Sequence, residues 1–255
     1  MSLRHWKTYA TAALQGRHWR ALFNMLRRAR PPGDFLRRYL RGKGQYPATV
    51  NIRRDSGLVP VMAWSWHDVL TINEIFFRED YPVPPESKVV VDLGSNIGIS
   101  VLYFLLETGP DGLVYAYEPV PENLEKLHLN LRGYEHRFQL APQAIGPAPG
   151  KAAFGVEKTG RYGGLGLAGE KTIEVDVLDV NAEIRRILER HSHIDVLKID
   201  IESLELDLLR AIDRDSLRKI RRIHLELNGE LDFAASGFAV SRRGMIYTLK
   251  NTLTP

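Results

Sequence analysis

The stretch VVVDLGSNIGIS, residues 89–100, decides the fold. Its opening residues have the continuous apolar character of a strand that is buried on both faces. The strand ends in Asp92, Gly94 follows, and Gly98 opens a helical stretch. Glycine at position 94 allows a tight turn and a close approach of a ligand to the backbone. The stretch therefore predicts a buried strand, a binding turn and a helix in direct succession.

Outward from this stretch, strand and helix patterns alternate as far as residue 228. The predicted strands cover residues 89–94, 113–119, 138–146, 172–179, 194–201 and 222–228. The predicted helices cover residues 97–107, 121–131, 181–191 and 203–212. This alternation predicts an α/β, Rossmann-like fold with a mostly parallel, doubly wound sheet of seven strands. The tail, residues 237–251, would supply a closing pair of strands.

The chain divides by composition into a basic arm at residues 1–45, a lead-in at 46–87 and a main domain at 88–255. The arm holds eleven Lys and Arg residues but a single acid, Asp34, whereas the remainder carries a net charge of −6. We expect short strands between residues 46 and 70 and a short helix at 71–80. The prolines at 82, 84 and 85 mark the start of the main domain.

The arm is predicted to be helical at residues 5–29 and 34–41. Trp19, Phe23 and Leu26, together with Leu22, form one apolar stripe at helical spacing. The interpretation that we favour is a helix pair packed on the body with a solvated basic face. The alternatives are docking onto an acidic partner or a membrane surface, or onto nucleic acid, which the acidic body makes the least favoured.

Composition excludes several classes of protein. The 255 residues include no cysteine, which excludes disulfides, thiolate zinc sites and cysteine nucleophiles. No apolar run approaches the roughly 20 residues of a transmembrane segment. The first residues carry charge and tryptophan where a signal peptide needs an apolar run. We therefore expect a cytoplasmic protein without a transmembrane segment.

The glycine spacing indicates the ligand. D-x-G-x-x-x-G differs from the G-x-G-x-x-G of dinucleotide enzymes, and no Gly-Lys-Ser/Thr follows it. A ligand with an adenosine but no phosphate fits better, and S-adenosylmethionine is such a ligand. Glu118 ends the next strand, where an acid can accept both ribose hydroxyls and disfavours a ribose phosphate. The alternative is a tight turn that binds no ligand.

Four stretches resemble the FkbM-type family of methyltransferases. They are TINEIFFREDY (71–81), VVVDLGSNIGIS (89–100), VYAYEPVPENLEKLHLN (114–130), and the run from VDVLDV (175–180) to LKIDIESLELDLL (197–209). The resemblance implies the class I methyltransferase fold and methyl transfer from S-adenosylmethionine, commonly to a hydroxyl of a sugar or natural product. Ser203 stands where the family usually has glycine. It either caps the following helix or alters the substrate pocket.

Ligands of parallel sheets bind beyond the carboxyl ends of the strands, and this rule selects the candidate cofactor residues. Asp92, Gly94, Ser95, Asn96 and Gly98 should line the methionine part of the cofactor. Glu118 should hold the ribose. Gln143 and Ala144, at the end of the third strand, are expected to flank the adenine.

The acceptor side is expected at the end of the strand 194–201. Lys198, Asp200 and Glu202 are the candidate catalytic residues, with Asp200 as base or orienting group, because Asp200 and Glu202 would share one face of an extended strand. Alternatively, Asp200 and Glu205 pair with Lys198 or cap the helix.

Other side chains near this end of the sheet are weaker candidates. Glu226 could add a carboxylate, and a magnesium cluster with Asp200 and Glu202 is conceivable, but we predict no metal. His224 is expected in the core, and His191 and His193 at the opposite edge of the sheet. The glycine-rich residues 160–169 form either a flexible connection or a lid that carries Tyr162.

Three functions of different kinds stay open. The first is a methyltransferase for a hydroxyl of a small-molecule acceptor. The second is a methyltransferase for a macromolecule that the basic arm docks. The third is a non-catalytic cofactor-binding protein of the same fold. The glycine spacing disfavours an NAD enzyme.

Overall fold

The computed structural model describes residues 16–156, 163–166, 171–202, 204–233 and 237–253. The chain folds into two compact units, Met1–Asp80 and Tyr81–Pro255. The basic helices and the lead-in strands share the first unit, and the second contains the large sheet. The predicted division into arm, lead-in and main domain stays a prediction.

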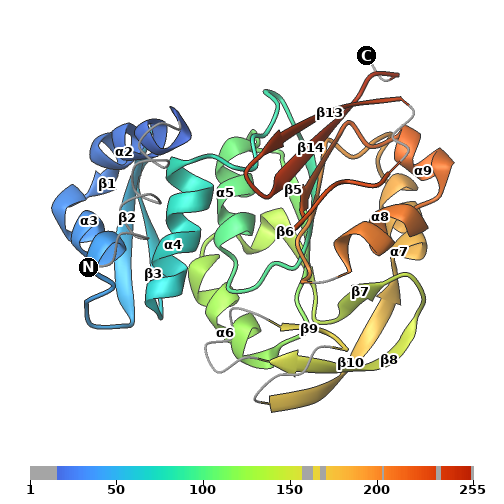
Figure 1. Cartoon of the computed structure of the whole chain (residues 1–255), viewed down its shortest axis with the longest axis horizontal. Helices are drawn as coiled ribbons and strands as arrows, with labels where there is room; N and C mark the ends of the chain where they lie inside the picture. Colours follow the sequence, from blue (N-terminus) through green and yellow to red (C-terminus); the bar gives the residue numbers. More distant parts are fainter. Residues whose placement is uncertain (1–15, 157–162, 167–170, 203, 234–236, 254–255) are drawn as a thin grey trace. The chain divides into compact units, whose positions relative to one another are not determined.

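A seven-stranded sheet forms the centre of the second unit, in the order β13-β14-β12-β11-β4-β5-β6 (Figure 1). The five strands from β12 to β6 are parallel, and the C-terminal hairpin closes the sheet with antiparallel pairs. This confirms the mostly parallel, seven-stranded sheet and the closing pair. The strands are β4 (Val89–Leu93), β5 (Leu113–Tyr117), β6 (Phe138–Ala141), β11 (Val196–Ile199), β12 (Arg222–Glu226), β13 (Phe238–Arg243) and β14 (Ile246–Asn251).

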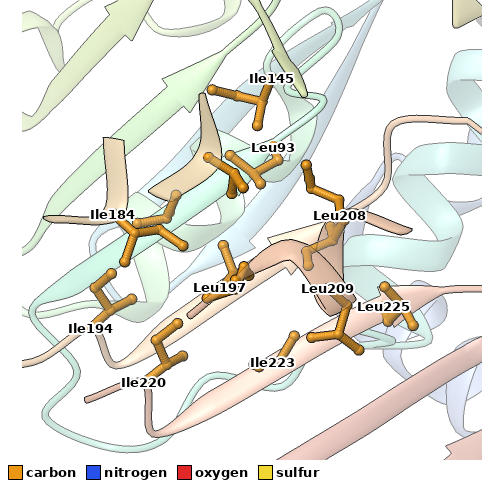
Figure 2. Packing of buried hydrophobic residues seen from close by; sticks show 14 of the residues in the cluster. Leu93, Ile145, Ile184, Ile194, Leu197, Leu208, Leu209, Ile220, Ile223 and Leu225 are labelled. Carbon is orange, nitrogen blue, oxygen red and sulfur yellow. The ribbon is translucent and has the colours of Figure 1, made fainter. Parts of the chain in front are cut away.

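Helices cover both faces of this sheet (Figure 1). One face carries α5 (Ile99–Glu107) and α6 (Pro121–Asn130), and the other carries α7 (Val180–Leu188), α8 (Glu205–Ala211) and α9 (Arg214–Arg218). On the second face, alternate residues of the strands pack against leucines and isoleucines of α7 and α8 (Figure 2). Since side chains alternate along a strand, the intervening residues of β4, β11 and β12 point to the α5 side.

A second, four-stranded sheet corrects two strand predictions. Residues 138–146 were expected as one strand, but β6 ends at Ala141 and β7 (Ala144–Gly146) belongs to the other sheet. Pro142 stands in the break, where it offers no N–H to a ladder. The predicted strand 172–179 also lies there, as β10 (Lys171–Asp179). The order is β7-β10-β8-β9, with β8 (Gly150–Val156) and β9 (Gly163–Leu165).

The first unit combines a three-stranded sheet with short helices. The elements are α2 (Gly16–Arg28), β1 (Ala29–Arg30), α3 (Pro32–Arg41), β2 (Ala48–Arg54), β3 (Gly57–Ala63), α4 (Trp66–Ile72) and the π-helical turn η1 (Asn73–Phe77). The lead-in helix was predicted to begin at residue 71, but it begins at Trp66. Ser65 and Asp68 form a reciprocal capping box there, and this box fixes the earlier start.

The apolar stripe of α2 was expected to pack on the protein, but most of it is exposed. Trp19 and Phe23 are exposed, whereas Ala21, Asn24 and Met25 on the other side of the helix are buried. None of the described helices combines the length and the apolar character that crossing a bilayer requires.

Candidate functional site

The register of the parallel strands brings four predicted positions to one edge of the large sheet. Leu93 pairs with Tyr117 on one side and with Ile199 on the other, and Ile199 pairs with Leu225. The residues that follow this row are Gly94, Glu118, Asp200 and Glu226. All four therefore lie at the carboxyl edge of the sheet, where ligands of such folds bind.

One residue earlier, a row of polar side chains crosses the α5 face of the sheet. Lys198 is paired with Asp92 on β4 and with His224 on β12, and His224 is paired with Thr248 on β14. Asp200 lies two residues beyond Lys198, and Glu226 two residues beyond His224. The two-residue period of a strand predicts the same face for them.

Lys198 is buried at the centre of this row, with 1% of its surface exposed. Its Nζ lies 3.0 Å from Asp92 Oδ1 and 3.2 Å from Asp200 Oδ2, and it donates to the carbonyl of Gly94 at 3.1 Å. Burial alone lowers the pKa of a lysine, but the charges of Asp200 and Asp92 outweigh it and raise the pKa of Lys198. The ammonium therefore stays charged and links the two carboxylates. The pairing of Asp200 with Lys198, one of the two interpretations from the sequence, is present.

Ser100, a residue that the sequence did not single out, holds the other oxygen of Asp92. Its hydroxyl donates to Asp92 Oδ2 at 2.6 Å from the first turn of α5. Lys198 and Ser100 thus each contact one oxygen of the carboxylate, but burial still raises the pKa of Asp92, so they offset only part of the cost of removing its charge from water.

Tyr81 is the second residue that the sequence analysis missed. Its hydroxyl lies 3.3 Å from Asp200 Oδ2 and 3.1 Å from Glu226 Oε2. Lys198 Nζ lies 5.6 Å from the centre of the Tyr81 ring, within cation–π range. In the sequence, Tyr81 stands at the end of the stretch 71–81 that resembles the family. Nothing in that stretch predicts that its side chain contacts a carboxylate.

His224 packs against the ring of Tyr81. Its ring centre lies 5.8 Å from that of Tyr81, and its Nε2 lies 3.0 Å from the carbonyl of Pro82. A carbonyl only accepts, so Nε2 carries the proton, and Nδ1 accepts from the hydroxyl of Thr248 at 3.0 Å. Burial lowers the pKa of His224 to about 3, so the ring stays neutral. The prediction of a packed core histidine is confirmed.

Removing the Tyr81 hydroxyl is expected to lower the free energy of unfolding. Tyr81→Phe takes away a donor that two carboxylates share, and we expect a loss of about 1–3 kcal/mol at neutral pH. Urea unfolding at neutral pH measures the loss.

Tyr247→Phe is the matched control for this prediction. Its hydroxyl donates to the carbonyl of Gly229 at 2.9 Å, a neutral acceptor, so removing it should cost less, about 1 kcal/mol. A loss for Tyr81→Phe no larger than that for Tyr247→Phe would show that the shared contact with the carboxylates has no additional energetic weight.

The glycine turn after β4, residues 94–98, is in close contact with another part of the protein's own backbone. Gly94, Asn96 and Gly98 have φ values of 83°, 46° and 82°, in the left-handed region. A Cβ on Gly94 would lie 1.9 Å from the carbonyl oxygen of Asp200. The close approach that requires glycine at 94 is therefore made by the backbone after β11. Contact between Gly94 and a ligand stays a prediction.

The N–H groups of this turn also donate within the protein. Gly94 and Ser95 donate to the carbonyl of Tyr117, and Gly98 donates to the carbonyl of Ser95. Asn96 N donates to Glu118 Oε2 at 2.9 Å, and Ile97 N donates to the side chain of Asn96. A ligand here would meet side chains and carbonyls rather than a cradle of backbone N–H groups.

Glu118 joins this turn to the end of β5. Besides Asn96 N, it accepts from Val120 N at 2.9 Å and from Asn123 Nδ2 at 3.1 Å. Burial raises the pKa of Glu118 to about 7. A carboxylate has about four acceptor positions, and three are occupied by these donors. In this arrangement one position suits a ligand hydroxyl, fewer than the two expected.

The remaining candidates lie between β6 and β7, in β7, after β11 and in α8. Ala144 begins β7 and is buried in the second sheet, with the half-buried Gln143 just before it. Glu202 follows β11 with a φ of 59°, so the extended strand that was to place it beside Asp200 has already ended. Burial, with the charge of Asp200, raises the pKa of Glu205 in the first turn of α8. Ser203 and Tyr162 lie outside the described residues.

The other two histidines lie before β11, as expected. His191 Nε2 lies 2.9 Å from the Tyr115 hydroxyl, and His193 Nε2 lies 3.1 Å from Asp195 Oδ1. Within the described residues, no group of three His, Asp or Glu side chains is placed to hold a metal ion.

Comparison with known proteins identifies the family. The Methyltransferase FkbM domain matches residues 92–245, more than half of the chain. AmbE, the AMB antimetabolite synthetase of Pseudomonas aeruginosa, is 27% identical over 205 residues, but the match covers 66% of this chain and 10% of AmbE. The chain thus corresponds to a small part of that relative.

Two other similar proteins are nearer in size. Methyltransferase 1 of Beauveria bassiana is 24% identical, and the match covers 67% of this chain and 78% of that protein. The solved structure of a methyltransferase from Geobacter sulfurreducens is 15% identical with a TM-score of 0.41, covering 67% of this chain and 73% of its own. The FkbM domain together with the sheet order confirms both the resemblance and the Rossmann-like class I methyltransferase fold. The chain therefore belongs to the FkbM family of methyltransferases.

Proposed function

We propose that this protein transfers the methyl group of S-adenosylmethionine to a hydroxyl oxygen of a small molecule. The observation that carries the proposal is the set of acids at the carboxyl edge of the sheet, Glu118, Asp200 and Glu226, within a matched FkbM domain. Their negative charge suits a cofactor with a sulfonium and an amino group.

The residues present fit this cofactor. Glu118 retains acceptor capacity for a ribose hydroxyl. The amino group of the cofactor is proposed to lie by the carbonyls of the turn, because both oxygens of the buried Asp92 already have partners. Gln143, which lies between β6 and β7, and Ala144, which begins β7, are the proposed adenine neighbours. When bound, the cofactor supplies an electrophilic methyl group on a positively charged sulfur.

Asp200 is the proposed acceptor-side residue. Lys198 and Tyr81 both contact its Oδ2, which fixes the orientation of the carboxylate, and its side chain is 26% exposed. A carboxylate held in this way can accept the hydroxyl proton while the acceptor oxygen is positioned for in-line attack. Glu202 lies close in sequence and is proposed to contact the acceptor.

The affinity for S-adenosylmethionine should fall with falling pH. In the proposed complex a ribose hydroxyl donates to the ionised form of Glu118. Burial raises the pKa of Glu118 to about 7. Protonation of Glu118 below that pH removes an acceptor. The dissociation constant for S-adenosylmethionine should therefore increase by up to about tenfold for each unit by which the pH is lowered. Calorimetric titration with S-adenosylmethionine and S-adenosylhomocysteine between pH 5 and pH 9, with NAD as a non-binding control, measures this.

Two variants decide whether Glu118 is responsible. Glu118→Gln should bind about ten- to a hundredfold more weakly at high pH and lose the pH dependence. Glu122→Gln, which changes an exposed acid in α6, should behave as the parent. Tight binding by Glu118→Gln would remove Glu118 from the cofactor site, and absence of binding by the parent would favour a non-catalytic protein.

The acceptor is tested by transfer of a labelled methyl group. Incubation with labelled cofactor and a panel of sugars and hydroxylated natural products should yield a product that resists mild base, as an ether does and a methyl ester does not. Label that appears only in added RNA or protein would support instead the macromolecular methyltransferase that was the alternative from the sequence.

A further inference from the structure

An apolar face of α2 is turned to solvent. Trp19, Phe23 and Leu26 are 61%, 63% and 50% exposed. Their spacing of four and three residues places them along one side of the helix. Three large apolar side chains in one exposed stripe are unusual for a helix that packs on a protein.

Contacts on the opposite side fix this orientation. Asn24 Nδ2 donates to the carbonyl of Phe77 at 2.8 Å, and Arg28 Nη1 reaches Glu79 Oε1 at 2.7 Å. Arg20 pairs with the same Glu79. Ala21 and Met25 are buried between these polar contacts. The polar side of the helix is thus attached to its own unit, and the stripe points away from it.

The helix that carries the stripe has charges of one sign only. The sequence of α2, GRHWRALFNMLRR, contains no acid. Arg27 is exposed one residue beyond Leu26, and in α3 the exposed Leu40 lies next to the exposed Arg41. Residues 1–80 carry fourteen Lys and Arg against six Asp and Glu. The partner must therefore offer an apolar phase together with negative charge.

We propose that the stripe of α2 inserts into the interface of a membrane that contains anionic lipids. Trp, Phe and Leu on one side of a short helix, with arginine beside them, is the composition of helices that lie in the plane of a bilayer. Tryptophan favours the headgroup level, and each nearby basic residue adds attraction to an anionic surface. Nucleic acid would use the arginines but would leave Leu26 and Phe23 in water.

Vesicle co-sedimentation of the full chain tests this surface. The protein should pellet with vesicles of phosphatidylcholine and phosphatidylglycerol in equal parts, and only weakly with phosphatidylcholine alone. Phe23→Ser and Leu26→Ser should each weaken binding at least about tenfold. Arg27→Glu should weaken binding to the anionic vesicles roughly tenfold or more, and the effect should diminish at high salt.

Leu58→Ser is the matched control, because Leu58 is an equally exposed leucine on β3 of the same unit. It should bind as the parent, and thermal unfolding should show all variants folded. If a serine variant fails to fold, Arg27→Glu, a change at an exposed position, still decides the question.

Several results would overturn the proposal. The first is failure of the parent to pellet with anionic vesicles, and the second is binding that the α2 variants leave unchanged. The third is a parent that forms dimers which Phe23→Ser dissociates, because a second copy would then cover the face. Binding to RNA but not to vesicles would show that this surface binds nucleic acid instead of a membrane. None of these measurements depends on methyl transfer, so they stand apart from the proposed activity.

Discussion

Lys198→Met should lower the free energy of unfolding by about 3–5 kcal/mol. The substitution removes the ammonium that links Asp92 and Asp200 and leaves the completely buried Asp92 with an uncompensated charge. Ser100 continues to donate to Asp92 Oδ2, but one neutral hydrogen bond does not replace a charge partner. Urea denaturation at neutral pH measures the loss.

The double variant Lys198→Met with Asp92→Asn separates the charge effect from packing. It removes both buried charges and should recover a large part of the lost stability, since replacing a whole buried pair is often neutral. Lys171→Met removes the exposed pair with Glu122 and should cost less than about 1 kcal/mol because water screens it. A Lys198→Met loss as small as that of Lys171→Met would refute the central role of the ion pair.

Gly94→Ala should unfold the protein or cost more than about 3 kcal/mol. Alanine at a φ of 83° carries the cost of the left-handed region, about 1–2 kcal/mol. In addition, its Cβ would fall 1.9 Å from the Asp200 carbonyl oxygen, so β4 and the segment after β11 must separate. Thermal unfolding and the yield of folded protein measure the effect, and we expect cofactor binding to be lost as well.

Gly133→Ala isolates the backbone contribution. Gly133 has a φ of 91°, and a Cβ there would meet no heavy atom within 4 Å. It should show only the left-handed cost, and the difference between the two variants reports the clash with Asp200. Equal losses would mean that the turn after β4 moves to accommodate a methyl group.

The sequence by itself determined the large sheet and the family. Buried parallel strands are continuous apolar runs, so VVVDLG and LVYAY were readable as strands without knowledge of their neighbours. The D-x-G-x-x-x-G spacing and the Glu-Pro after the second strand were also local, and they led to the FkbM resemblance that the domain match confirms. Local periodicity could not assign strands to sheets, which is why β7 and β10 were placed in the wrong one.

Only the tertiary structure decided how the site is connected. Lys198 meets Asp92 because β11 and β4 pair in one particular register, and a shift by one residue would turn one of the two side chains to the other face. Tyr81 lies 119 residues from Asp200 and 145 from Glu226 in the chain, so no local pattern relates them. The apolar stripe of α2 was visible in the sequence, but its direction depended on Asn24 and Arg28, whose partners lie about 50 residues further along. Periodicity reveals that a helix has two faces, and only the contacts of the folded chain determine which of them is turned inward.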